Sequence, residues 1–226
     1  MRTPGTPVPF PRSLRAILPA LLLAGLLGAC GSPPTDRSTG VYLLLDTSGT
    51  YTEELDKAKQ IISYTLSQLD PGDAFAVARI DTGSFSEKDI IAKVTFDGRP
   101  SAANNQKRLF REEIEQFVAD VQPARFTDIT GGLLQAIEWL NEQDPGAKRI
   151  LVFSDLKEDL PEGYVRDDIA LQFDGFDVVA LNVTKLSSDN VDPREYLDRL
   201  EEWKQRVEAG GGDWRVVNDL DRLTFL

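Results

Sequence analysis

Short apolar runs alternate along this chain with longer stretches whose apolar residues recur at helical spacing. Val41–Leu45 is a continuous apolar run, which is typical of a strand buried on both faces. The stretch Thr52–Leu69 then repeats apolar residues every three or four positions, and Ala74–Ile80 is again strand-like. Alternation of this kind predicts a mainly parallel sheet that is covered by helices.

The same alternation continues along the rest of the sequence. Apolar spacing predicts three further helices, at Leu109–Val121, Gly131–Asn141 and Pro193–Ala209, and four further strands, at Ile91–Phe96, Ile150–Phe153, Val178–Val183 and Trp214–Val217. The sequence contains no internal repeat and no second hydrophobic core. We therefore predict one doubly wound, Rossmann-like α/β domain over Gly40–Leu226, with a mainly parallel sheet and helices on both faces.

The N-terminal segment has the features of an export signal. Residues 1–29 carry three arginines and no acidic residue, and they end in an apolar stretch, Ala16–Ala29, that is too short to span a bilayer. Small residues, Gly28 and Ala29, precede Cys30, the only cysteine of the chain. This pattern resembles a bacterial lipoprotein signal, whose cysteine is acylated and becomes the mature N-terminus; an ordinary secretory signal or an uncleaved anchor is the alternative.

The lipoprotein resemblance implies a location and a domain plan. Residues 1–29 are the expected signal peptide, residues 30–39, rich in Pro, Ser and Thr, are the expected tether, and residues 40–226 are the expected domain. The lipid on Cys30 would anchor the protein in the bacterial cell envelope, facing the periplasm or the cell surface. Gly31 is not the aspartate associated with retention in the inner membrane, which favours the outer membrane.

Composition excludes several classes of function. The sequence contains no histidine, which removes the commonest general base and the usual zinc ligand. Without residues 1–29, the chain has 22 basic and 37 acidic residues, a net charge of −15. Such a surface repels phosphate backbones, so we expect no nucleic-acid partner.

Hard-cation ligands follow the predicted strands. Asp46, Ser48 and Thr50 come directly after the run 41–45, and Asp155 follows the strand at Ile150–Phe153. Sheets of this type bind their ligands beyond the carboxyl ends of the strands, at the point where the strand order reverses. If the two strands are neighbours at this point, Asp46 and Asp155 would face the same crevice. Thr127 precedes a predicted helix and could overhang the same crevice. Together these side chains offer the oxygen ligands that Mg²⁺ prefers.

The order Asp46-x-Ser48-x-Thr50, then Thr127, then Asp155 resembles the metal-ion-dependent adhesion site of von Willebrand factor A domains. The resemblance covers nearly the whole of Gly40–Leu226. It implies a non-catalytic domain that holds Mg²⁺, with Ca²⁺ or Mn²⁺ as possible substitutes, and that binds a protein partner whose Glu or Asp completes the metal's shell.

Other interpretations of these residues remain open. Asp46 and Ser48 could simply cap a helix, as could Thr127 or Thr130, and Asp155 could cap a short helix in Leu156–Leu160. Asp46 also resembles the nucleophile of haloacid-dehalogenase-like, Mg²⁺-dependent phosphatases, with Asp155, Asp159 and Lys148 as possible companions. Ser48 weighs against that enzyme because it replaces the acid that protonates the leaving group. A metal-free domain with the same scaffold is the third possibility.

Overall fold

The computed structural model describes residues 37–219, apart from 50, 52, 53, 82, 84, 167 and 168. The predicted signal peptide, Cys30 and most of the predicted tether lie outside the described residues, as does Thr50. Within the described part, the elements are β1 (Thr39–Asp46), α2 (Leu55–Gln68), β2 (Ala74–Ile80), β3 (Ile90–Thr95), α3 (Pro100–Asp120), α4 (Ile129–Gln143), β4 (Ala147–Phe153), β5 (Phe176–Leu181), α5 (Pro193–Ala209) and β6 (Asp213–Val217), with single 3-10 turns at Glu87–Asp89 and Ser188–Asn190.

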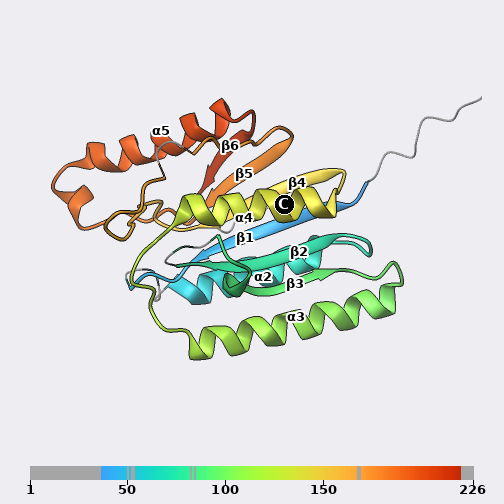
Figure 1. Cartoon of the computed structure of the whole chain (residues 1–226). Helices are drawn as coiled ribbons and strands as arrows, with labels where there is room; N and C mark the ends of the chain where they lie inside the picture. Colours follow the sequence, from blue (N-terminus) through green and yellow to red (C-terminus); the bar gives the residue numbers. More distant parts are fainter. Residues whose placement is uncertain are drawn as a thin grey trace, which may run out of the picture. The chain divides into compact units, whose positions relative to one another are not determined.

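The described strands form one six-stranded sheet in the order β3-β2-β1-β4-β5-β6 (Figure 1). All neighbouring pairs are parallel except β2 and β3, which are antiparallel. The strand order reverses at β1, which pairs with β2 on one side and β4 on the other. This confirms the predicted doubly wound, mainly parallel α/β fold, including the edge strand at residues 90–95.

Each face of the sheet is covered by its own pair of helices. Tyr42 and Leu44 of β1 point to the face that α4 and α5 cover, whereas Leu43 and Leu45 point to the face covered by α2 and α3 (Figure 1). These four side chains have no solvent exposure, which explains why β1 is apolar throughout. α4 lies close to β1 because Gly132 has no side chain: a Cβ there would lie 2.9 Å from Leu44 Cδ2.

Helix boundaries differ from the sequence predictions where polar residues hide the periodicity. α3 begins at Pro100, nine residues before the predicted start, because its first turns are largely polar and carry one buried residue, Ala103. The N-cap of α4 is Asp128, whose carboxylate accepts a hydrogen bond from Gly131 N, so Thr127 and Thr130 are not caps. α5 has the predicted bounds, from Pro193 at its first turn to Ala209 before Gly210.

The amino end of the sheet carries an ion-pair ladder. Asp177 of β5 lies between Arg149 of β4 and Arg215 of β6; its carboxylate is 3.0 Å from Arg149 Nε and 3.2 Å from Arg215 Nε. All three side chains are partly exposed. Among the helices of the described residues, none is long and apolar enough to cross a membrane.

Candidate metal centre

Asp46 and Asp155 lie at the carboxyl ends of the adjacent parallel strands β1 and β4. Leu45 pairs with Phe153 in the sheet, so Asp46 and Ser154 are the next residues along the two strands. Side chains alternate between faces along a strand, and this register directs Asp46 and Ser154 to the same face. Asp46 is fully buried and Asp155 is 4% exposed. The neighbouring strands predicted from the sequence therefore bring the two aspartates to one edge of the sheet.

Both carboxylate oxygens of Asp46 accept hydrogen bonds from its surroundings. Ser48 N donates to Oδ1 at 2.8 Å and the Ser154 hydroxyl donates to Oδ2 at 2.6 Å. α2 begins only at Leu55, and its N-cap residue, Glu54, makes no side-chain capping bond. Asp46 and Ser48 therefore do not cap that helix, and their arrangement is that of a turn at the strand end.

Backbone bridges hold two further loops against this strand end. Ala124 N donates to Thr47 O at 2.8 Å, which joins the segment before α4 to the segment after β1. Thr127 N donates to Asp159 O at 2.7 Å, and Asp159 N donates to Thr127 O at 3.0 Å. Thr127 is 5% exposed. The loops that carry Ser48, Thr127 and Asp155 are thus linked to one another by the main chain.

Asp155 stands in a strained turn. Its Oδ1 accepts a hydrogen bond from Lys157 N at 2.8 Å, and no helix forms in residues 156–160, so Asp155 is not a helix cap. The next residue, Leu156, has φ of +65° and is 1% exposed. A left-handed backbone at a buried leucine costs about 1–3 kcal/mol and persists only where neighbouring contacts impose it.

The two aspartates resist ionisation. Burial raises the pKa of Asp46, although hydrogen bonds from Ser154 and Ser48 oppose this rise. Burial, with a smaller contribution from the charge of Asp46, raises the pKa of Asp155 to about 6, although the hydrogen bond from Lys157 N and the charges of Arg199 and Lys157 oppose this rise. Among the described residues, neither carboxylate has a basic side chain within ion-pair distance. A cation placed between them would relieve both costs.

The chemistry of the side chains fits a small divalent cation with oxygen ligands. Asp46 and Asp155 supply two carboxylates, and Ser48 and Thr127 supply neutral hydroxyls from neighbouring loops. Within the described residues, no cluster of three Asp, Glu, His or Cys side chains could hold an ion. A two-carboxylate site leaves the cation electrophilic, with room for water or a further anion.

Three residues near this site were not singled out by the sequence analysis as functional. Ser154 connects the two strand ends through its hydroxyl, and strand alternation alone could have identified it. Arg199 and Trp203 come from α5 and contact the turn at Asp155, and Trp203 belongs to the hydrophobic core, with 3% exposure. Tyr51, in the segment between β1 and α2, is also buried, and its hydroxyl donates a hydrogen bond to Asn182 O after β5.

Of the residues that suggested a phosphatase, Asp46 and Asp155 lie at the site but Lys148 does not. Lys148 pairs with Gly40 near the amino end of the sheet, six residues before Ser154, which places it about 20 Å from the strand end. Its Nζ donates to Asn141 Oδ1 at 2.7 Å instead. Asp159 is joined to Thr127 through its backbone.

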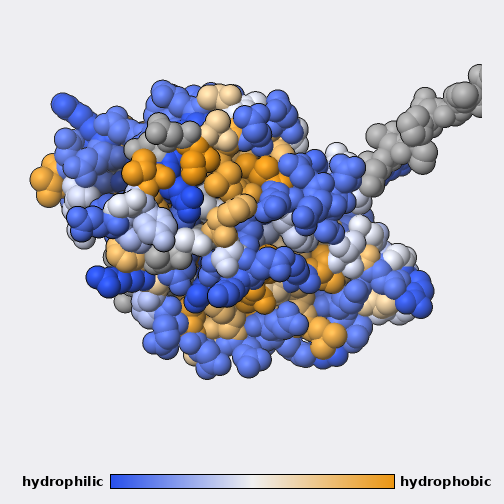
Figure 2. Space-filling model, in the orientation of Figure 1, coloured by the Kyte–Doolittle hydropathy of each residue, from blue (hydrophilic) through white to orange (hydrophobic). Residues whose placement is uncertain are grey.

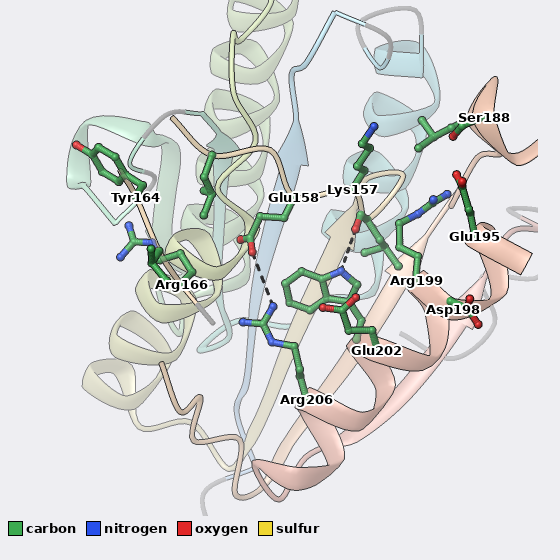
Figure 3. Close-up of a pocket in the computed structure, with 15 residues that line it drawn as sticks. Lys157, Glu158, Tyr164, Arg166, Ser188, Glu195, Asp198, Arg199, Glu202 and Arg206 are labelled. Carbon is green, nitrogen blue, oxygen red and sulfur yellow. Dashed lines mark hydrogen bonds and ion pairs between the residues drawn. The ribbon is translucent and has the colours of Figure 1, made fainter. Parts of the chain in front are cut away.

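A groove of about 600 Å³ lies beside the turn at Asp155 (Figure 3). One wall is α5, from which Glu195, Asp198 and Glu202 face the groove, and the other is the segment 156–166. In Figure 2, apolar side chains gather on the surface between α4 and α5. The candidate metal centre therefore borders a concave surface.

Comparisons with known proteins find similarity in structure and none in sequence. No family model matches the chain, and no curated protein sequence matches it. The von Willebrand factor type A protein from Catenulispora acidiphila superposes with a TM-score of 0.55 at 15% identity, over 82% of this chain and 40% of that one. The pilus adhesin SpaC from Lactobacillus rhamnosus GG, in its open conformation, gives 0.54 at 12% identity, over 82% and 28%.

The chain thus spans well under half the length of both similar proteins. At such low identity the superpositions establish the shared fold. They do not transfer the activity of either whole protein to this chain. The strand order, the helices on both faces and these superpositions agree: the chain has the fold of a von Willebrand factor type A domain.

Proposed function

We propose that this protein is a non-catalytic, metal-dependent binding domain of the bacterial cell envelope. Asp46, Ser48, Thr50, Thr127 and Asp155 would hold a divalent cation, Mg²⁺ or in its place Ca²⁺ or Mn²⁺. A protein partner would donate a Glu or Asp carboxylate to the open side of that cation. The lipidated Cys30 would tether the domain to the membrane.

One observation supports this proposal above the others. Asp46 and Asp155 are two buried carboxylates at adjacent strand ends, and among the described residues no basic side chain pairs with either. Burying a carboxylate without an ion-pair partner in contact is costly, and a raised pKa is one sign of that cost. A bound divalent cation would neutralise both groups at neutral pH.

The non-catalytic part of the proposal rests on the residues that a phosphatase would need. Ser48 stands where such an enzyme carries the acid that protonates the leaving group. Lys148, the candidate companion for a phosphatase, lies near the other end of the strand. A small-phosphoester assay with Mg²⁺ tests this part, because turnover that Asp46→Asn abolishes would favour the enzyme.

Titration of Mg²⁺ into the full-length protein tests the metal site. We expect saturable binding in the wild type and none in Asp46→Ala. Asp56→Ala is the matched control, because Asp56 is an aspartate of α2 whose side chain is 83% exposed and should not affect binding. Absence of binding up to about tens of millimolar, above the weak range for extracellular cation modules, would refute the metal site.

The partner and the anchor need separate experiments. Pull-down from envelope extracts should recover a partner with Mg²⁺ present and lose it with a chelator or in Asp46→Ala. Acyl labelling should mark the wild type and not Cys30→Ser. Partner recovery that is insensitive to the chelator would contradict a metal-mediated grip, and an unlabelled wild type would contradict the lipid anchor.

A further inference from the structure

Two side chains of α5 grip the backbone that carries Asp155. Arg199 Nε donates to Asp155 O at 2.9 Å, and Trp203 Nε1 donates to Leu156 O at 2.9 Å. The two donors are four residues apart, so they lie on the same face of α5, one turn from each other. In Figure 3, Arg199 points from α5 toward the segment that contains Lys157. Consecutive carbonyls of one turn are thus held by one helix face.

Both donors are themselves fixed in place. Arg199 binds Asp189 through both terminal nitrogens, at 2.9 and 3.3 Å, and the Asp189 side chain is fully buried. The guanidinium of Arg206 lies 4.3 Å from the ring centroid of Trp203 and donates to the hydroxyl of Thr130 at 2.8 Å. A planar guanidinium that is bound on two sides loses little further freedom when it holds a carbonyl.

The gripped turn is the strained one. Leu156 keeps its left-handed backbone while its N–H donates to the Ser154 hydroxyl at 3.0 Å. The same hydroxyl donates to Asp46 Oδ2. If Leu156 relaxed to an ordinary backbone conformation, its N–H would leave Ser154 and the Asp155 side chain would change direction. The conformation of this turn therefore sets the relation between the two aspartates.

We propose that Arg199 and Trp203 are positioning residues that hold the Asp155 turn in the conformation required for metal binding. The inference rests on the metal site proposed above. α5 supplies no ligand in this scheme. It stabilises the strained turn, so that Asp155 is already placed beside Asp46 before the cation arrives, and the cost of ordering the turn does not reduce the metal affinity.

Two variants and two matched controls test the inference in the full-length protein. Trp203→Phe keeps the ring and removes the donor, and Arg199→Lys keeps the charge and removes the planar fork. Trp139→Phe, in α4, and Arg149→Lys, in the ion-pair ladder at the amino end of the sheet, are the same replacements at buried or half-buried positions away from the turn.

The first readout is Mg²⁺ affinity. We expect a loss of about 10- to 100-fold in Trp203→Phe and Arg199→Lys, the range typical of removing an outer-shell partner of a metal ligand. The second is hydrogen exchange of the peptide 154–158 in metal-free protein, which should accelerate about 10-fold or more in these two variants. Both control variants should stay near wild type in both readouts, even if their thermal unfolding midpoints fall as far as those of Trp203→Phe and Arg199→Lys.

The outcomes separate this inference from the proposed function. If the wild type binds no Mg²⁺, the metal site fails, and the exchange measurement alone then decides whether α5 positions the turn. If the wild type binds Mg²⁺ and the two variants bind it as well as the controls do, the inference is overturned, whether or not exchange has changed. Unchanged exchange in both variants also overturns it.

Discussion

The two ends of the sheet differ in whether their buried or half-buried aspartates have ion-pair partners. At the amino end, Asp177 lies between Arg149 and Arg215, so its charge is balanced by the protein itself. At the carboxyl end, Asp46 and Asp155 are more deeply buried, and among the described residues no basic side chain pairs with either. The first arrangement is complete without a ligand, whereas the second has two carboxylates that repel each other.

This difference indicates which end carries the function. Groups whose ionisation is disfavoured by burial and by a like charge are typical of binding sites, because a fold has no need for them in its own stability. The carboxyl end is also where the strand order reverses and where α/β sheets of this type bind ligands. The following predictions test the contrast between the two ends.

The largest expected effect is on metal binding. Asp155→Asn should abolish saturable Mg²⁺ binding, a loss of about 1,000-fold or about 4 kcal/mol, because one of only two charged ligands disappears. Asp177→Asn makes the same change at the amino end and should bind Mg²⁺ like the wild type. Titration calorimetry on the two variants gives the comparison. Equal losses in both would mean that Mg²⁺ responds to the net charge of the protein and not to this site.

The next effect is the pH dependence of stability without metal. The pKa of Asp155 is raised to about 6 in the folded protein, so its protonated carboxyl favours the folded state. This contribution to the free energy of unfolding is fully present below the ordinary pKa of an aspartate, near 4, and is lost as the pH rises through about 6. The metal-free protein should lose about 3 kcal/mol of unfolding free energy over this interval from Asp155 alone. Urea unfolding in a chelator, at fixed ionic strength between about pH 4 and pH 7.5, measures it.

Two controls sharpen this pH prediction. Asp155→Asn should flatten the slope and be more stable than the wild type at neutral pH, whereas Asp177→Asn should keep the slope. Saturating Mg²⁺ should also flatten the slope in the wild type, because the bound cation stabilises the ionised carboxylates. A metal-free protein that gains stability as the pH rises through about 6 would contradict the sign of the effect.

A smaller loss of stability is expected when the Ser154 hydroxyl, which connects the two strand ends, is removed. Ser154→Ala removes the donor to Asp46 and the acceptor of Leu156 N–H, and it should cost about 1–2 kcal/mol of unfolding free energy. Thr65→Val is the control, since this buried hydroxyl donates only to Ile61 O within α2. Urea unfolding of both variants measures the difference. A Ser154→Ala variant no less stable than Thr65→Val would mean that the hydroxyl does not hold the strand ends.

The same contrast explains what the sequence could predict. Asp46 and Asp155 follow apolar runs, and the sheet order that joins β1 to β4 is the common outcome of βαβ units, so both residues could be placed from local pattern and general rules. Ser48 and Thr127 were found because they lie near those strands or before a helix in the chain. The expected strands β2 and β3 and the helix α5 agree with the structure because apolar spacing, Pro193 and Gly210 mark them.

The contacts that complete the site are of another kind. Arg199 and Trp203 are 44 and 47 residues from the carbonyls that they bind, and helical spacing tells only which face they share. The Asp128 cap was missed because Thr127, Asp128 and Thr130 lie within four positions and each can cap a helix, and only the backbone direction decides among them. The left-handed Leu156 has no sequence signal, because its conformation is imposed by tertiary contacts.

The smallest effect is expected at the amino end. Arg215→Ala removes one of the two arginines that flank Asp177, from a side chain that is 38% exposed, and Arg149 remains as a partner. Partly exposed ion pairs contribute little, so we expect a loss below about 1 kcal/mol that shrinks as salt is added. Urea unfolding at low and high ionic strength measures it. A loss above about 2 kcal/mol that persists in high salt would show that the ladder is a tightly coupled element and that the two ends of the sheet differ less than their geometry indicates.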